Sequence, residues 1–197
     1  MDSEITVVSG LPRSGTSLMM QMLDQGGIEI VTDHIRTADT DNPRGYYEFE
    51  KVKQIKDDAS WLPATRGKAF KMVSQLLYDL PASEEYCILF MQRDLDEVLA
   101  SQEKMLARLG RTAAPRERMK QSFLLHLERL RDWLAGRANM EVLYVPYSDL
   151  IRQPLAQAER VCEFLGHKAN IECMAQSVDP ALYRNRKAVS GLSDKPD

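Results

Sequence analysis

The chain has 197 residues, of which 44% are hydrophobic and 28% charged, and its formal net charge is −3. These values are ordinary for a globular protein, and no block of like charges favours a nucleic-acid partner. No apolar segment approaches the length that spans a bilayer, and the acidic start "MDSEITVVSG" lacks the basic region of a signal peptide. We therefore expect one cytoplasmic domain over residues 1–197, with no membrane contact and a flexible tail at about 188–197.

Three cysteines, Cys87, Cys162 and Cys173, form an odd and widely spaced set without the spacing of a metal site. We expect them to be reduced thiols, and we expect no bound metal. The apolar stripes along the chain do not distinguish a core from a subunit interface, so the sequence predicts no oligomeric state.

The first predicted elements are a strand, a glycine-containing turn and a helix. Residues 4–9, "EITVVS", indicate a short buried strand that ends at Gly10. A helix is expected from Thr16 or Ser17 to the Gly26–Gly27 pair, which is a typical stop signal. Residues 32–47 follow as a long polar loop, a length that is usually functional.

Strands and helices then alternate along the rest of the chain. Apolar runs predict strands at 68–73, 86–93 and 141–147, of which 86–93 is the clearest. Helical spacing predicts helices at 94–110, 115–135 and 154–166, and residues 48–58 are a further helical candidate. This alternation predicts a three-layer α/β fold of the P-loop nucleotide-kinase type, with a central parallel sheet between helices and ligands at the carboxyl ends of the strands.

The stretch "VVSGLPRSGTSLMM", residues 7–20, contains what we call the glycine loop, residues 10–17. Backbone N–H groups at a helix start form an anion site, and Arg13 adds a positive charge. Thr16 stands where a nucleotide triphosphatase has its lysine, and the clearest later strand ends in Gln92–Arg93 instead of a metal-binding acid. The pattern favours an anionic group held without magnesium; the alternative is an ordinary structural turn.

These residues resemble the PAPS-dependent sulfotransferases, in particular the small bacterial-type members (PAPS is 3′-phosphoadenosine 5′-phosphosulfate). The resemblance implies that "PRSGTS" binds the 5′-phosphosulfate through Pro12, Arg13, Ser14, Gly15, Thr16 and Ser17. It also implies that "QRDLDEVLAS" binds the 3′-phosphate through Arg93 and Ser101. Taken separately, Arg93 is more typical of a surface arginine that flanks a helix, and Ser101 of a solvent-facing helix serine.

The resemblance extends over roughly residues 4–187. "YVPYSDLIRQP" resembles the family segment whose tyrosine lies beside the adenine, which implies that role for Tyr147. The family often directs basic groups of its C-terminal stretch to the 3′-phosphate, and Arg184 and Arg186 occupy that stretch here. The chain departs from the family where "KMVSQ" places Val73 at the position of the catalytic histidine of the cytosolic animal enzymes.

Because this histidine is missing, the resemblance does not identify the catalytic base. Other branches of the family use a glutamate after the first helix, which favours Glu48, although an acid near a helix start also stabilises the helix dipole. His34 is the second choice, because the ordinary pKa of histidine, about 6.5, suits proton transfer. Asp33 and Glu50 remain alternatives, and Arg13 is expected to stabilise charge on the departing phosphate oxygen.

The resemblance implies transfer of a sulfuryl group from PAPS to a hydroxyl or amine of a small-molecule or carbohydrate acceptor. One alternative is a binding module that keeps the site for PAPS or its product PAP (3′,5′-adenosine bisphosphate) without catalysis. Another is a P-loop small-molecule kinase that uses ATP and magnesium.

Overall fold

The computed structural model describes residues 4–33, 35, 45–166, 169–179 and 181. Three predicted site residues, His34, Arg184 and Arg186, lie outside the described residues, as does the predicted tail. The described part is built on a four-stranded sheet with the order β2-β1-β3-β4, and every neighbouring pair is parallel. All four carboxyl ends therefore lie at one edge of the sheet.

The strands form where the apolar runs predicted them. They are β1 (Ile5–Gly10), β2 (Ala69–Lys71), β3 (Tyr86–Gln92) and β4 (Met140–Pro146). The central residues of β1, β2 and β3 are buried because helices cover both faces of the sheet, which is why these strands read as continuous apolar runs, whereas the middle of the edge strand β4 is only partly buried. In the register, Val7 of β1 lies opposite Phe70 of β2 and Ile88 of β3.

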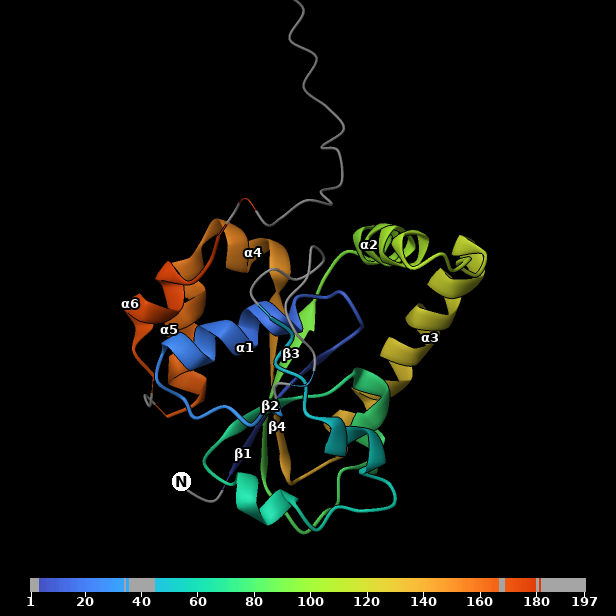
Figure 1. Cartoon of the computed structure of the whole chain (residues 1–197). Coiled ribbons are helices and arrows are strands. Elements are labelled where there is room, and N and C mark those ends of the chain that lie inside the picture. Colours follow the sequence, from blue (N-terminus) through green and yellow to red (C-terminus); the bar gives the residue numbers. More distant parts are fainter. Residues whose placement is uncertain (1–3, 34, 36–44, 167–168, 180, 182–197) are drawn as a thin grey trace, which may run out of the picture.

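Four helices cover one face of the sheet (Figure 1). They are α1 (Thr16–Gln25), α4 (Tyr147–Arg152), α5 (Pro154–Phe164) and α6 (Ile171–Gln176). Buried side chains of all four helices join Val8, Leu89 and Val145 from the strands in one apolar core. The start of α6 is also fixed to the end of α1, because the backbone N–H of Asn170 donates to the carbonyl of Gly26.

The second face is covered by α3 (Arg116–Ala135) and by three short 3₁₀ helices, η1 (Glu50–Gln54), η2 (Leu62–Thr65) and η3 (Ser74–Asp79). Leu130 and Leu134 of α3 pack with Phe70 and Ile88 in a second core. Helix α2 (Leu95–Arg108) follows β3 at the carboxyl edge and packs with α3. The predicted three-layer α/β fold with a parallel sheet is confirmed.

Two local predictions were wrong. Residues 48–58 contain the single short 3₁₀ helix η1 instead of an α-helix, because only a few residues separate the loop from the next turn. Tyr147 was predicted as the end of a strand, but it is the first residue of α4. Pro146 ends the strand, since proline has no N–H for a further ladder bond.

Among the described residues, none of the helices combines the length and the apolar character that crossing a membrane requires.

Candidate anion-binding site

The glycine loop connects β1 to α1 at the carboxyl edge of the sheet. Its backbone has positive φ at Gly10 (150°), Arg13 (70°) and Gly15 (105°). A non-glycine residue with positive φ costs free energy and marks a backbone shape that the surroundings impose, often at a functional site. The loop closes on itself where the N–H of Ser14 donates to the carbonyl of Leu11, at 3.1 Å.

The first turn of α1 opens at this loop. Its cap residue, Gly15, has no side chain to bond the first amides, and the N–H groups of Thr16 and Ser17 have no partner within a helix. Thr16 and Ser17 are half-buried, whereas Pro12 is exposed on the loop. The helix start therefore presents backbone amides and two hydroxyls, groups of the kind that bind anions at helix starts.

Gly15 packs directly against the ring of Tyr147. A Cβ atom at Gly15 would lie 2.4 Å from Cδ2 of Tyr147, so no other residue fits there without movement. Tyr147 is buried at the start of α4, immediately after β4. The contact therefore fixes the loop after β1 against the element that follows β4, across the carboxyl edge of the sheet.

Arg93 connects the glycine loop to three other elements. Its Nη1 donates to the carbonyl oxygen of Arg13 at 3.2 Å, and its Nε donates to Oε2 of Glu97 at 3.0 Å. Its guanidinium carbon lies 4.5 Å from the centre of the Tyr147 ring, a cation–π distance. The side chains of Arg93 and Glu97 are only 9% and 7% exposed, so this ion pair is almost desolvated.

Ser101 completes the cluster. It is buried on α2, two turns after the helix start, and its Oγ accepts a hydrogen bond from Nε of Arg13 at 3.1 Å. The structure thus brings Arg13, Arg93, Ser101 and Tyr147 together. Their roles toward a ligand stay predictions.

Lys71 reaches the helix start from the neighbouring strand. Its Nζ donates to Oγ of Ser17 at 3.1 Å, and Ser17 donates to the carbonyl of Tyr46 at 3.3 Å. The same Nζ lies 5.9 Å from the centre of the Tyr46 ring. A lysine from β2 therefore stands beside the start of α1, where a triphosphatase places a lysine of the loop itself.

Glu48 lies two residues after Tyr46, whose carbonyl accepts the hydrogen bond from Ser17. The carbonyl of Glu48 accepts hydrogen bonds from Oγ1 of Thr32 and N–H of Asp33, at 2.8 and 3.1 Å, which ties the segment to the end of the first long loop. Asp33 in turn accepts from the N–H groups of Glu50 and Ile35. Although burial opposes the effect, these bonds lower the pKa of Asp33, which makes it a weaker base.

The hydroxyl of Ser14 points away from the donors of the helix start. Ser14 is 1% exposed and lines a cavity between the loop and α3, and its Oγ has no hydrogen-bond partner in the part of the chain that the structure describes. Because its N–H is used within the loop, Ser14 presents neither donor to the open side of the loop in this conformation. Its assignment as a phosphate ligand stays a prediction.

Sequence reasoning missed two functional candidates, Glu97 and the Ser74–His126 pair. Glu97 lies four residues after Arg93 in a helix start, a spacing that predicts an ion pair. The Ser74–His126 pair joins η3 to the middle of α3, with 2.8 Å between Oγ and Nε2. No local pattern indicates it, because its members are far apart in the chain. Val73, at the family's histidine position, is 40% exposed beside it.

Across the part of the chain that the structure describes, no group of three or more histidine, cysteine, aspartate or glutamate side chains has the arrangement of a metal site.

Comparisons with known proteins bear on the family of the chain. A sequence profile of the Sulfotransferase family matches residues 46–170, which is more than half of the chain. A 3-alpha-hydroxysteroid sulfotransferase of the guinea pig, Cavia porcellus, is 26% identical over 186 residues. The aligned region is 86% of this chain but only 61% of the guinea-pig protein, so the chain spans less than two thirds of that relative.

A solved structure shows the same fold. The sulfotransferase domain from the curacin biosynthetic pathway superposes with a TM-score of 0.51 at 13% identity, over 91% of this chain and 89% of that chain. A sulfotransferase from Alicyclobacillus acidocaldarius gives a TM-score of 0.49 at 18% identity, over 83% of this chain and 81% of that one.

His126 should make stability depend on pH. Burial lowers its pKa, so the unfolded chain binds this proton more tightly than the folded protein does. The stability that neutral His126 contributes is complete above the unfolded-state pKa of about 6.5 and is lost as the pH falls through and below it. Urea unfolding between pH 8 and pH 5 should therefore show a steeper loss for the wild type than for His126→Gln. Parallel profiles would contradict this prediction.

Proposed function

Because the chain belongs to the sulfotransferase family, we propose that it transfers a sulfuryl group from PAPS to a hydroxyl or amine of a small-molecule or carbohydrate acceptor. The observation that carries the proposal is the cluster at the carboxyl edge, where two arginines, a buried serine and a tyrosine ring meet an uncapped helix start. A nucleotide with two separate phosphate groups matches this set of donors and this ring.

The 5′ side of the donor is assigned to the start of α1. The amides and hydroxyls of Thr16 and Ser17 supply neutral donors, and Lys71 and Arg13 supply positive charge from either side. Arg13 has its φ in the left-handed region, which the loop maintains at a cost in free energy. A cationic side chain held beside a helix start by a strained backbone is the arrangement expected where negative charge develops during a reaction.

The 3′-phosphate is assigned to Arg93 and Ser101. Arg13 contacts both residues, through its Nε to Ser101 and through its carbonyl to Arg93, so the two halves of the donor site adjoin. The guanidinium of Arg93 packs over the ring of Tyr147, and this ring is the aromatic surface assigned to the adenine. The proposed contributions of Arg184 and Arg186 concern residues outside the described part.

When bound, PAPS supplies a sulfuryl group joined to the 5′-phosphate through a bridging oxygen. In the proposed reaction the acceptor oxygen or nitrogen bonds to sulfur as the bond to the bridging oxygen breaks. Glu48 takes the proton of the acceptor, and Arg13 stabilises the negative charge left on the phosphate oxygen. Glu48 is assigned because its segment contacts Ser17 through Tyr46.

One observation favours a second candidate function. Val73 replaces the family's histidine and is exposed, so the position that supplies a base elsewhere supplies none here. A binding module that holds PAP without catalysis is consistent with this residue. Turnover with a panel of phenols, alcohols, amines and carbohydrates separates the two functions, since a binding module forms no sulfated product.

Nucleotide binding tests the donor site directly. PAP should bind the wild type in calorimetry, and Arg93→Ala should weaken binding by about tenfold to a hundredfold, because a hydrogen bond to a charged group contributes about 1.5–3 kcal/mol. Arg13→Ala should have a similar effect without removing Arg93, the ion-pair partner of Glu97. Arg118→Ala, on the exposed side of α3, is the matched control. Absence of PAP binding by the wild type would refute the proposal.

Glu97 should oppose nucleotide binding through its charge. It accepts from Arg93 in a nearly desolvated position, so its negative charge acts on any phosphate that Arg93 holds. Glu97→Gln keeps an acceptor for Nε of Arg93 and removes the charge, so the dissociation constant for PAP should fall by about threefold to tenfold. The effect should be absent in an Arg93→Ala background. Weaker binding by Glu97→Gln would show instead that its charge orients Arg93.

Glu48 is tested by turnover. Glu48→Gln removes the proton acceptor, so kcat should fall by about a hundredfold or more while PAP binding stays unchanged. Glu50→Gln is the control, because Glu50 lies two residues away and pairs with Lys53 at the surface. Equal turnover by the wild type and Glu48→Gln would exclude this residue as the base and leave the transfer reaction in place.

A further inference from the structure

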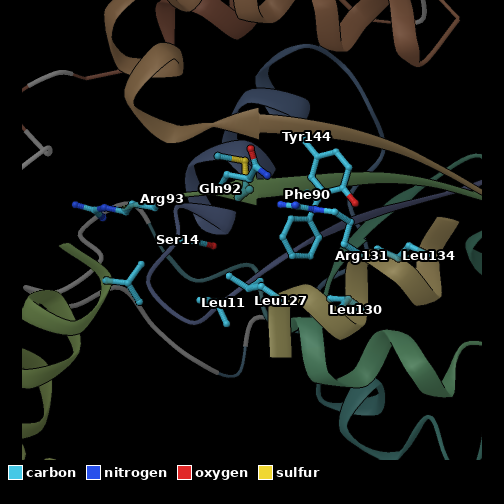
Figure 2. Close-up of a pocket in the computed structure, with 12 residues that line it drawn as sticks. Leu11, Ser14, Phe90, Gln92, Arg93, Leu127, Leu130, Arg131, Leu134 and Tyr144 are labelled. Carbon is cyan, nitrogen blue, oxygen red and sulfur yellow. The ribbon is translucent and has the colours of Figure 1, made fainter. Parts of the chain in front are cut away.

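A cavity of about 170 Å³ lies beneath the glycine loop, between α3 and the carboxyl ends of β3 and β4 (Figure 2). Leu11 and Ser14 of the loop, Phe90 and Tyr144 of the sheet, and Leu127 of α3 line it. Lys71 and Ser17 meet beside α1, on the opposite face of the sheet. The cavity is therefore separate from the helix start that is assigned to the donor.

The size and walls of the cavity suit one aromatic ring. An apolar cavity of about 150 Å³ holds a benzene molecule, so this cavity has room for one six-membered ring with small substituents. The rings of Phe90 and Tyr144 stand edge to face, with centres 5.6 Å apart and planes at 60°. Another ring can continue this edge-to-face packing, and Leu127 supplies an aliphatic wall on the side of α3.

Two polar side chains give the cavity a chemical preference. The Ser14 hydroxyl is buried in its wall and has no hydrogen-bond partner among the described residues, a state that costs free energy unless a bound group completes it. Arg131 extends from α3 toward Phe90 and Tyr144 and has no hydrogen bond or ion pair among the described residues. A planar guanidinium matches a carboxylate, with which it forms two parallel hydrogen bonds.

We propose that this cavity is a binding site for a single-ring aromatic carboxylate. The ring packs between Leu127 and the edges of Phe90 and Tyr144, and the carboxylate pairs with Arg131. The hydroxyl of Ser14 bonds a second polar substituent on the ring, such as a phenolic hydroxyl. The cavity shares Arg93 with the cluster assigned to the 3′-phosphate, whereas Leu127, Arg131 and Tyr144 lie outside that cluster. Binding of the aromatic acid does not depend on the proposed sulfuryl transfer.

The test uses 4-hydroxybenzoate as the probe, with calorimetry on the full chain. Its binding should weaken by about tenfold or more in Arg131→Gln and should be unchanged in Arg129→Gln, which removes the same charge two residues away. The neutral analogue 4-hydroxybenzamide should bind the wild type about tenfold more weakly than the acid does. The amide and the acid should bind Arg131→Gln with equal affinity, because the variant has no charge to distinguish them. Leu127→Phe should abolish binding by filling the cavity.

Three results would overturn the proposal. They are no binding of 4-hydroxybenzoate at about 10 mM, unchanged affinity in Arg131→Gln, or complete displacement of the probe by PAP, which would place it at the helix start instead. Circular dichroism and the unfolding midpoint establish that each variant is folded. If Leu127→Phe does not fold, the exposed position of Arg131 keeps the charge test available. A failure of PAP binding alone would refute the donor assignment and leave this site intact.

Discussion

The arrangement of the carboxyl edge depends on the buried guanidinium of Arg93. A desolvated charge requires partners on all sides, and these come from Glu97, the carbonyl of Arg13 and the ring of Tyr147. Each partner belongs to a different segment, so one side chain joins the end of β3 to the glycine loop, α2 and α4. The left-handed backbone at Arg13 is maintained by these surroundings, since the carbonyl that Arg93 binds belongs to the same residue.

The loop differs from a nucleotide triphosphatase loop in where its lysine comes from. Thr16 occupies the lysine position within the loop, and Lys71 brings its ammonium group to Ser17 from the neighbouring strand. A charge from β2 approaches the helix start from the side, next to Tyr46 and the segment of Glu48. An ammonium group in this position can contact both a bound anion and a group that approaches the anion, whereas a lysine within the loop contacts only the anion.

Local patterns predicted most of the fold, because buried parallel strands and amphipathic helices are both visible in short windows. The strand at Tyr86–Gln92 and the glycine loop were identified in this way, whereas Arg93 and Ser101 were identified only through the family resemblance. Tertiary contacts were not predicted. The hydrogen bond between Ser74 and His126, the unpartnered Ser14 hydroxyl and the cavity beside Arg131 arise where segments distant in the chain meet. The same holds for the turns of η1 to η3, whose shape is set by packing and not by periodicity.

The strand order has a consequence for biosynthesis. Strand β1 lies in the interior of the sheet, yet both of its partners follow it in the chain, with Phe70 and Ile88 opposite Val7. At about 5–20 residues per second, a ribosome needs about 4–16 s to add the 80 or so residues that separate Val7 from β3. Until β2 emerges, after about 60 of these residues, the apolar strand β1 has no strand to pair with, so its hydrophobic side chains and unpaired backbone stay exposed on the nascent chain.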